Sequence, residues 1–399
     1  MTTLSPSDSA TTARRAIHEY LDAAQSAMRA CSEDIYAHPE LSGQEYRSSK
    51  KLADVARAAG FTVEMGIGGL PTAFRAEITG GLGADGPTVC YLAEYDALPT
   101  VGHGCGHNFI GTASTYAALG LAAAAPHFKG RVVLMGTPAE ETDGGKIDLQ
   151  RAGAFRDVDL AMMVHPAGET DAYTVSLALI PVRVRFHGAP AHAAARPWDG
   201  LNALDAMIQF FVMLDHLKKQ FPTHVRIPGI ITKGGVRSNI VPELTEAEFS
   251  VRSTTRAELE RVFARFIQCG QAAALATGCR FEYEEFGNRY HEMRTNGPLA
   301  ECFHHHFEAL GGQVERAARK DFGSIDIGNL SHDFPCIHPR VRTCSPETGG
   351  HTVEFGDATI TPFGHEQLRR SAETMALVGL DYLIDPALRQ QVRLAFQSS

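Results

Sequence analysis

The sequence predicts an α/β protein whose mostly parallel, doubly wound sheet is interrupted by a small α+β domain. Short apolar segments alternate with helical stretches up to about residue 180, the rhythm changes there, and the alternation returns after Asn296. Short apolar strands separated by helices are typical of a parallel sheet. A chain of 399 residues also exceeds one ordinary core, so two domains are expected.

The first part of the chain is expected to begin with two helices within residues 13–60, separated by His38-Pro39-Glu40. Gly60 ends the second helix as a C-cap glycine. Apolar segments then predict strands at 72–78, 88–93, 131–136 and 159–164, with helices at about 109–125 and 146–154.

The middle of the chain has a different order of elements. It predicts a strand (181–187), a helix (200–220), two strands (225–232 and 244–253), a helix (256–277) and a strand (280–285). That order is the split βαβ, ferredoxin-like unit. The expected organisation is a main α/β domain in two parts, 1–181 and 293–399, with an inserted domain at 182–292. An exposed strand edge in the inserted domain has to be covered, and a second copy of the chain could do so.

Composition excludes several classes of partner. The net charge of −9 argues against a nucleic acid or an anionic membrane, because either would favour a basic surface. No apolar stretch is long enough for a signal peptide or a bilayer span, so we expect a cytoplasmic protein. The eight cysteines need not pair in a reducing compartment. Seven are expected to be small buried apolar residues, and Cys105 is the exception because of its neighbours.

Potential ligands of a divalent metal ion follow three consecutive predicted strands: Cys105 and His107 after 88–93, Glu140 and Glu141 after 131–136, and His165 at the end of 159–164. Ligands of an open α/β sheet bind at this carboxyl edge. Thiolate, imidazole and carboxylate together suit a zinc-like or manganese-like ion.

Each of these signals has a simpler explanation when taken alone. A Cys-x-His pair is more often structural, adjacent glutamates are usually solvated, and a single histidine at a strand end is usually a core residue. Their joint occurrence after three successive strands is what favours a metal site. Of two adjacent carboxylates, one can bind metal while the other accepts a proton from water. We assign Glu141 to the metal and Glu140 to the base, although the sequence alone is compatible with either order. The tract 304–306, three histidines, is interpreted as helix surface.

Ordered motifs run over almost the whole chain: His38-Pro-Glu, Asp96-Ala-Leu-Pro, Gly104-Cys-Gly-His-Asn, Pro138-Ala-Glu-Glu, His165-Pro, Gly188-Ala-Pro-Ala-His, Ser238-Asn-Ile-Val-Pro-Glu, Gly323-Ser-Ile-Asp-Ile-Gly-Asn and Gly350-His-Thr. With these motifs the chain resembles the aminoacylase and carboxypeptidase G superfamily of metallopeptidases. The resemblance is strongest to an amidohydrolase branch that includes p-aminobenzoyl-glutamate hydrolase and cytosolic dipeptidases acting on β-alanyl or basic dipeptides.

The resemblance implies two divalent ions, zinc or manganese, held by Cys105, His107, Glu141, His165 and His351. Other branches of the superfamily place a histidine and a bridging aspartate in the first cluster. Here the segment 94–96 lacks that histidine, and Cys105 takes the position of the bridging carboxylate. Glu140 is then expected to be the general base, and Asp96 to orient His107.

The resemblance also implies a homodimer formed through the inserted domain. In such a dimer His192 would reach the site of the partner subunit and donate a hydrogen bond to the developing oxyanion. Asn239 and Arg252 are expected to contact the substrate. The simpler alternatives are that His192 caps a loop, that Asn239 turns the chain, and that Arg252 is surface charge.

The expected function is hydrolysis of a C–N amide bond in a small N-acyl amino acid, dipeptide or aryl amide, by metal-activated water with Glu140 as general base. One alternative is a cysteine-nucleophile hydrolase using Cys105 and His107, which leaves the glutamates and His165 without a role. Another is a non-catalytic binding protein on the same fold, which predicts that ligands have been lost. A chelator separates the first alternative from the metal-dependent reaction.

Overall fold

The computed structural model describes residues 6–316 and 323–398. Among these residues the chain forms two compact units. The first runs up to Val175 and resumes at Met293, and the second begins at Ser176 and extends to Glu292. The second unit therefore begins a few residues before the expected boundary at 182, because its first strand, β7 (Ala178–His187), already starts at Ala178.

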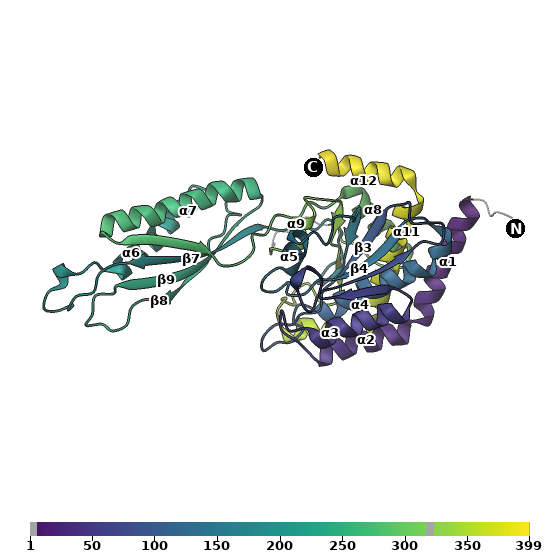
Figure 1. Ribbon diagram of the computed structural model, residues 1–399, viewed down its shortest axis with the longest axis horizontal. Helices are drawn as coiled ribbons and strands as arrows, with labels where there is room; N and C mark the ends of the chain where they lie inside the picture. Colours follow the sequence, from purple (N-terminus) through teal and green to yellow (C-terminus); the bar gives the residue numbers. More distant parts are fainter. Residues whose placement is uncertain (1–5, 317–322, 399) are drawn as a thin grey trace. The chain divides into compact units, whose positions relative to one another are not determined.

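The first unit is built on a six-stranded mixed sheet in the order β1-β2-β4-β3-β5-β11. Figure 1 labels two neighbouring strands of this sheet, β3 and β4. Strands β3 (Thr88–Ala93), β4 (Arg131–Gly136), β5 (Leu160–Met162) and β11 (Cys336–Ile337) are parallel. An antiparallel hairpin of β1 (Thr62–Met65) and β2 (Phe74–Thr79) continues the sheet beyond β4. The prediction of a mostly parallel α/β sheet is confirmed.

Helices pack closely around the central strands. Helix α4 (His107–Ala123) lies on β3 and β4, and α1 (Pro6–Ala23), α2 (Gln25–Ala37) and α11 (Pro362–Ile384) pack around it. Helix α4 is apolar on nearly all sides, as expected for a helix that is buried all round. Helices α3 (Tyr46–Ala58), α5 (Gly145–Arg151), α8 (Gly297–Ala309), α9 (Ile327–Leu330), α10 (Val353–Ala358) and α12 (Pro386–Ser398) complete the unit.

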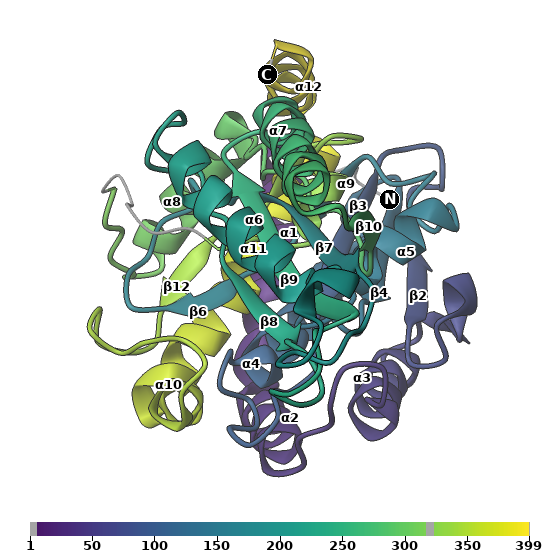
Figure 2. The same ribbon diagram turned by 90° about the vertical axis from the view of Figure 1, so that its left-hand side faces the viewer.

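Several details of the first unit differ from the sequence prediction. The segment before His38, where one helix was expected, forms the two helices α1 and α2. The strand expected at 159–164 ends at Met162, and His165 begins a separate strand, β6 (His165–Ala167), which pairs with β12 (Arg340–Arg342) in a two-stranded sheet (Figure 2). The tract 304–306 is not helix surface throughout, since His304 and His306 are buried. Both histidines make hydrogen bonds inside the unit. His304 Nε2 accepts the N–H of Ala172, and His306 Nε2 donates to Asp381 Oδ2.

The second unit is a four-stranded antiparallel sheet in the order β10-β7-β9-β8. Its strands are β7, β8 (Gly229–Lys233), β9 (Leu244–Ser253) and β10 (Arg280–Glu285), and helices α6 (Ala203–Lys218) and α7 (Arg256–Thr277) pack on β7 and β9. Along β7 and β9 buried residues alternate with partly exposed ones, so one face forms a core and the other carries ion pairs such as Arg183–Glu248. The ferredoxin-like order of elements is as predicted.

No helix in the described part of the chain combines the length and the apolar character needed to cross a bilayer.

Candidate metal centre

The carboxyl ends of the strands in the first unit deliver the candidate ligands. Strand β3 leads into the segment with Asp96 and then, through a loop, to Cys105 and to His107, the first residue of α4. Between the last two, Gly106 has a φ of +76°, and a Cβ there would come within 2.5 Å of Pro166 Cγ. Only glycine meets both requirements without strain, so the close approach of this turn to the strand with His165 depends on it.

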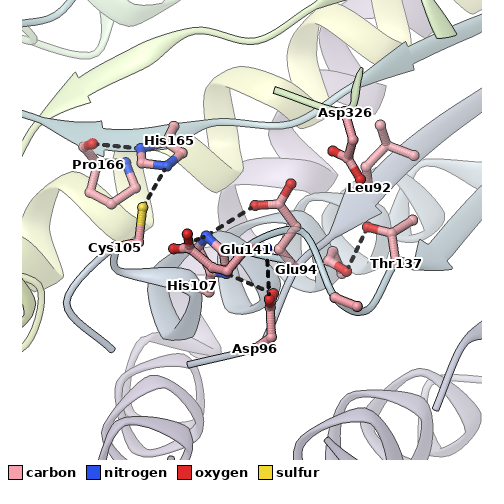
Figure 3. Close-up of polar contacts among 12 residues, drawn as sticks. Leu92, Glu94, Asp96, Cys105, His107, Thr137, Glu141, His165, Pro166 and Asp326 are labelled. Atoms are coloured by element: carbon pink, nitrogen blue, oxygen red, sulfur yellow. Dashed lines mark hydrogen bonds and ion pairs between the residues drawn. The ribbon is translucent and has the colours of Figure 1, made fainter. Parts of the chain in front are cut away.

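The structure brings the donor atoms of all five expected ligands and Glu140 together in overlapping groups. Figure 3 shows four of these residues, Cys105, His107, Glu141 and His165. The atoms within each of three groups lie within 4.8 Å of one another: Cys105, His107 and His165; Cys105, Glu141 and His351; and His107, Glu140 and Glu141. Cys105, His107 and Glu141 each belong to two of the groups. Cys105 Sγ lies 3.5 Å from His165 Nε2, and His107 Nε2 lies 3.7 Å from Glu141 Oε1. His351 Nε2 lies 3.6 Å from the other oxygen of Glu141.

Hydrogen bonds orient the buried His107 and the half-buried His165 toward this cluster. His107 Nδ1 donates to Asp96 Oδ1 at 2.8 Å, and His165 Nδ1 donates to the carbonyl of Pro166 at 2.7 Å. Because a carboxylate and a carbonyl can only accept, Nδ1 of each ring carries a proton, and Nε2 is the nitrogen that faces the cluster and can bind a metal ion once it has lost its own proton. Burial opposes a charge on His107, but the Asp96 carboxylate outweighs it and raises the pKa of His107 well above its usual value.

The donor set fits a divalent metal ion. His107 Nε2 and Glu141 Oε1 are buried and make no hydrogen bond, although buried polar atoms nearly always have a partner. They converge with a sulfur and further imidazole nitrogens, and this mixture of nitrogen, sulfur and oxygen is that of zinc-type sites.

The environment of Cys105 does not suit a nucleophile. Burial raises the pKa of its thiol, and the neighbouring His107 does not reverse the rise. A catalytic cysteine needs the opposite, a lowered pKa in an electropositive setting. The thiol is better matched to a metal, which deprotonates a coordinating cysteine outright.

The loop after β4 holds Glu140 and Glu141 in a defined conformation. Ala139 has a φ of +59°, a strained value for a residue with a side chain, and its N–H donates to Glu45 Oε1 at 3.0 Å. The N–H of Glu141 donates to Asp96 Oδ2 at 3.0 Å. Burial raises the pKa of Glu140 well above that of an ordinary carboxyl, and nearby carboxylates including Glu94 add to the rise.

The remaining expected residues lie in the second unit. His192 is exposed, and its Nδ1 accepts the N–H groups of Ala194 and Ala195 at 3.3 and 3.2 Å. Asn239 lies beside it, since its carbonyl accepts the N–H of Ala193. Arg252 is half-buried rather than surface charge, and its Nε is buried without a hydrogen bond.

Three residues at the centre were missed by sequence reasoning: Glu94, Lys146 and Asp326. Glu94 directly follows β3, and its Oε2 lies 3.5 Å from His107 Nε2. Its position directly after a buried strand could have indicated Glu94 as a candidate. Asp326 lies inside one of the ordered motifs, but no local signal indicates Lys146, because lysine is almost never fully buried.

Comparisons with known proteins agree with this fold. Residues 178–276 match a family described as peptidase dimerisation domain. The chain is 37% identical to a Xaa-Arg dipeptidase of Mus musculus, over 96% of this chain and 92% of that protein. It is 27% identical to a p-aminobenzoyl-glutamate hydrolase chain of Escherichia coli, over 96% and 94% of the two chains.

Solved structures share the architecture. A putative aminohydrolase from Staphylococcus aureus superposes with a TM-score of 0.76 at 22% identity, covering 93% of this chain and all of that one. A dinuclear metal-binding peptidase of the M20 family from Bacillus subtilis superposes with a TM-score of 0.70 at 20% identity, covering 91% and 99%.

Fold and relatives together define a metal-dependent hydrolase of carbon–nitrogen bonds. The chain belongs to the M20 family of peptidases. The resemblance inferred from the ordered motifs is thereby confirmed.

Proposed function

We propose that this protein hydrolyses the amide bond of a dipeptide or a similarly small N-acyl amino acid or aryl amide, using two divalent ions, zinc or manganese. The observation that carries the proposal is the grouping of four donor side chains with the carboxylate pair Glu140 and Glu141. The four are Cys105, His107, His165 and His351. A dipeptide is placed first because the 37% identical relative is a Xaa-Arg dipeptidase.

The donor groups suggest how the ions would be held. Cys105, His107 and His165 would hold one ion, and Cys105, Glu141 and His351 the other, with the Cys105 sulfur shared. The ions, when bound, activate water and polarise the substrate carbonyl. Asp96 keeps Nδ1 of His107 protonated, so that Nε2 is available as a ligand.

Glu140 is the group we assign to proton transfer. It accepts the proton of the attacking water and passes it to the leaving nitrogen, which is a role for a carboxyl whose pKa is raised. Its neighbour Glu141 is assigned as a ligand, and the hydrogen bond from the Glu141 N–H to Asp96 Oδ2 holds the backbone at this carboxylate in place.

His192 is proposed to donate a hydrogen bond to the oxyanion in the partner subunit of a homodimer. Since Nδ1 accepts two backbone N–H groups, the ring proton lies on Nε2, which is the arrangement a donor needs. A homodimer through the second unit is supported by the match to a dimerisation domain and by the exposed edge strand β8, where Ile230 and Ile231 are 65% and 44% exposed. Asn239 and Arg252 are proposed substrate contacts.

A cytoplasmic location completes the proposal, because scattered free cysteines suit a reducing compartment. Fractionation of the source cells would test it, and recovery outside the cytoplasm would refute it.

The function is tested with a panel of dipeptides, N-acyl amino acids and aryl amides. Chelation should abolish hydrolysis, and zinc or manganese should restore it. The decisive variant is Glu140→Gln, which should bind metal like the wild type but turn over about a hundredfold to ten-thousandfold more slowly. Activity that survives chelation, or near-normal turnover by metal-replete Glu140→Gln protein, would refute the proposed mechanism.

A further inference from the structure

A fully buried ion cluster adjoins the metal centre. Lys146 and Asp326 are 0% exposed and Glu94 is 2% exposed. Lys146 Nζ donates to Glu94 Oε1 at 2.5 Å and to Asp326 Oδ1 at 2.7 Å. Replacing such a cluster with neutral groups of similar volume is often neutral or stabilising, so its presence is not explained by stability. We refer to these three residues as the buried triad.

The buried triad anchors the end of the loop that carries Glu140 and Glu141. Lys146 is the second residue of α5, and its N–H donates to Asp326 Oδ2 at 3.1 Å. The loop closes tightly just before it, because a Cβ on Gly145 would come within 2.0 Å of the Pro138 carbonyl. An anchor at Lys146 therefore also restrains the residues that follow Pro138.

Three buried carboxylates hold this one loop. Glu45 accepts the N–H of Ala139, Asp96 that of Glu141, and Asp326 that of Lys146. Asp96 also orients His107 through Nδ1. The buried triad reaches the other nitrogen of the same imidazole. One oxygen of Glu94 accepts from Lys146, and the other lies 3.5 Å from His107 Nε2 and makes no hydrogen bond (Figure 3).

We propose that Lys146 is a positioning residue of the hydrolytic site, which cross-links Glu94 and Asp326 and so fixes both the loop bearing Glu140 and the carboxylate that faces His107. This inference rests on the proposed function. Lys146 is fully buried and bonded to Glu94 and Asp326, so it is assigned an indirect role through these two carboxylates. Its effect is on geometry, and a displacement near 1 Å at reacting groups costs about a hundredfold in rate.

The test replaces the whole triad with neutral groups of similar shape, Glu94→Gln, Lys146→Met and Asp326→Asn together. Lys146→Met alone would leave two buried carboxylates unpaired and could fail to fold, whereas the triple variant keeps an oxygen at position 326 for the N–H of residue 146. A matched control is Arg75→Met, Glu77→Gln and Asp157→Asn, which neutralises one cation and two carboxylates joined at 2.7 and 2.8 Å elsewhere in the same unit.

The triple variant should fold and retain the wild-type metal content. Its kcat should fall by about a hundredfold while KM changes by less than about threefold, since alignment and not binding is lost. Amide hydrogen exchange in the peptide 137–149 should become about tenfold faster in the metal-free protein, a readout independent of activity. The control should change neither quantity.

A folded, metal-replete triple variant with wild-type kcat would overturn the proposal, and so would an equal loss in the control. A triple variant that does not fold would also overturn it, because the triad would then act in folding. These outcomes differ from failure of the proposed function, in which the wild-type protein itself would show no metal-dependent amide hydrolysis.

Discussion

Replacing Asp96 with asparagine should weaken metal binding without unfolding the protein. The buried carboxylate accepts three hydrogen bonds, from His107 Nδ1 and Ser42 Oγ at 2.8 Å each and from the N–H of Glu141 at 3.0 Å. An amide keeps only one of the two oxygens. Turned with its NH2 toward His107, it forces the imidazole proton onto Nε2, which faces the metal. Turned the other way, it leaves the donors of Ser42 and Glu141 facing another donor.

The expected size of the effect follows from these contacts. Loss of one hydrogen bond to a charged group costs about 1.5–3 kcal/mol. That range agrees with the loss of about 10–100-fold in metal affinity that follows removal of the carboxylate partner of a ligating histidine. Asp96→Asn should therefore bind zinc about 10–100-fold more weakly in competition with a chromophoric chelator.

A matched control is Glu373→Gln. Glu373 is also buried and accepts a hydrogen bond from a histidine, His18 Nδ1, at 2.8 Å, but it lies on α11 and belongs to none of the donor groups. It should lower stability and leave metal affinity unchanged. Wild-type metal affinity in folded Asp96→Asn protein would refute the reasoning.

Three further predictions concern other parts of the molecule. His351→Ala should bind one ion fewer by metal analysis but melt near the wild-type temperature, since the side chain is 60% exposed; unchanged metal content would remove His351 from the site. His192→Ala protein should turn over about a hundredfold more slowly. Mixing it with Glu140→Gln protein should restore activity, because a mixed dimer contains one site with both residues intact. If the subunits exchange and the mixture is no more active than its components, catalysis across the interface is excluded. Asp381→Asn should lower the free energy of unfolding at pH 7 by about 1–3 kcal/mol in urea titrations. Burial opposes a lowered pKa at Asp381, but His306 and Arg14 outweigh it and lower the pKa below 3.8. The stabilisation is therefore fully present above the pKa of the unfolded carboxyl and is lost as pH falls through the lower, folded pKa. The variant and the wild type should begin to converge only below the unfolded pKa and should meet below the folded one. A difference that stays constant over that range would contradict this.

Much of the fold could be predicted because it depends on local patterns. Apolar segments of strand length and the turn residues between them predicted β3 and β4 close to their observed bounds. They also predicted the four strands and two helices of the second unit to within a few residues. The shorter edge elements were less accessible. Strand β6 holds only three residues, and its separation from β5 depends on pairing with β12, far along the chain.

The same distinction applies to the candidate site. The sequence by itself determined which residues could serve as ligands, because cysteine, histidine and glutamate stood at the ends of successive strands and in ordered motifs. Whether Glu140 or Glu141 binds metal remains a prediction, since both side chains lie in one donor group.

Only the tertiary structure decided how those side chains are held. The Lys146 ammonium meets carboxylates 52 and 180 positions away in sequence, and the strained φ of Ala139 is maintained by Glu45 from a different segment. Burial of His304 depends in the same way on its contact with Ala172. The local sequence shows the hydrophobic periodicity of a helix or strand and the chemistry of its side chains. Burial, ion pairing and ring orientation arise from contacts between distant segments, which no local pattern encodes.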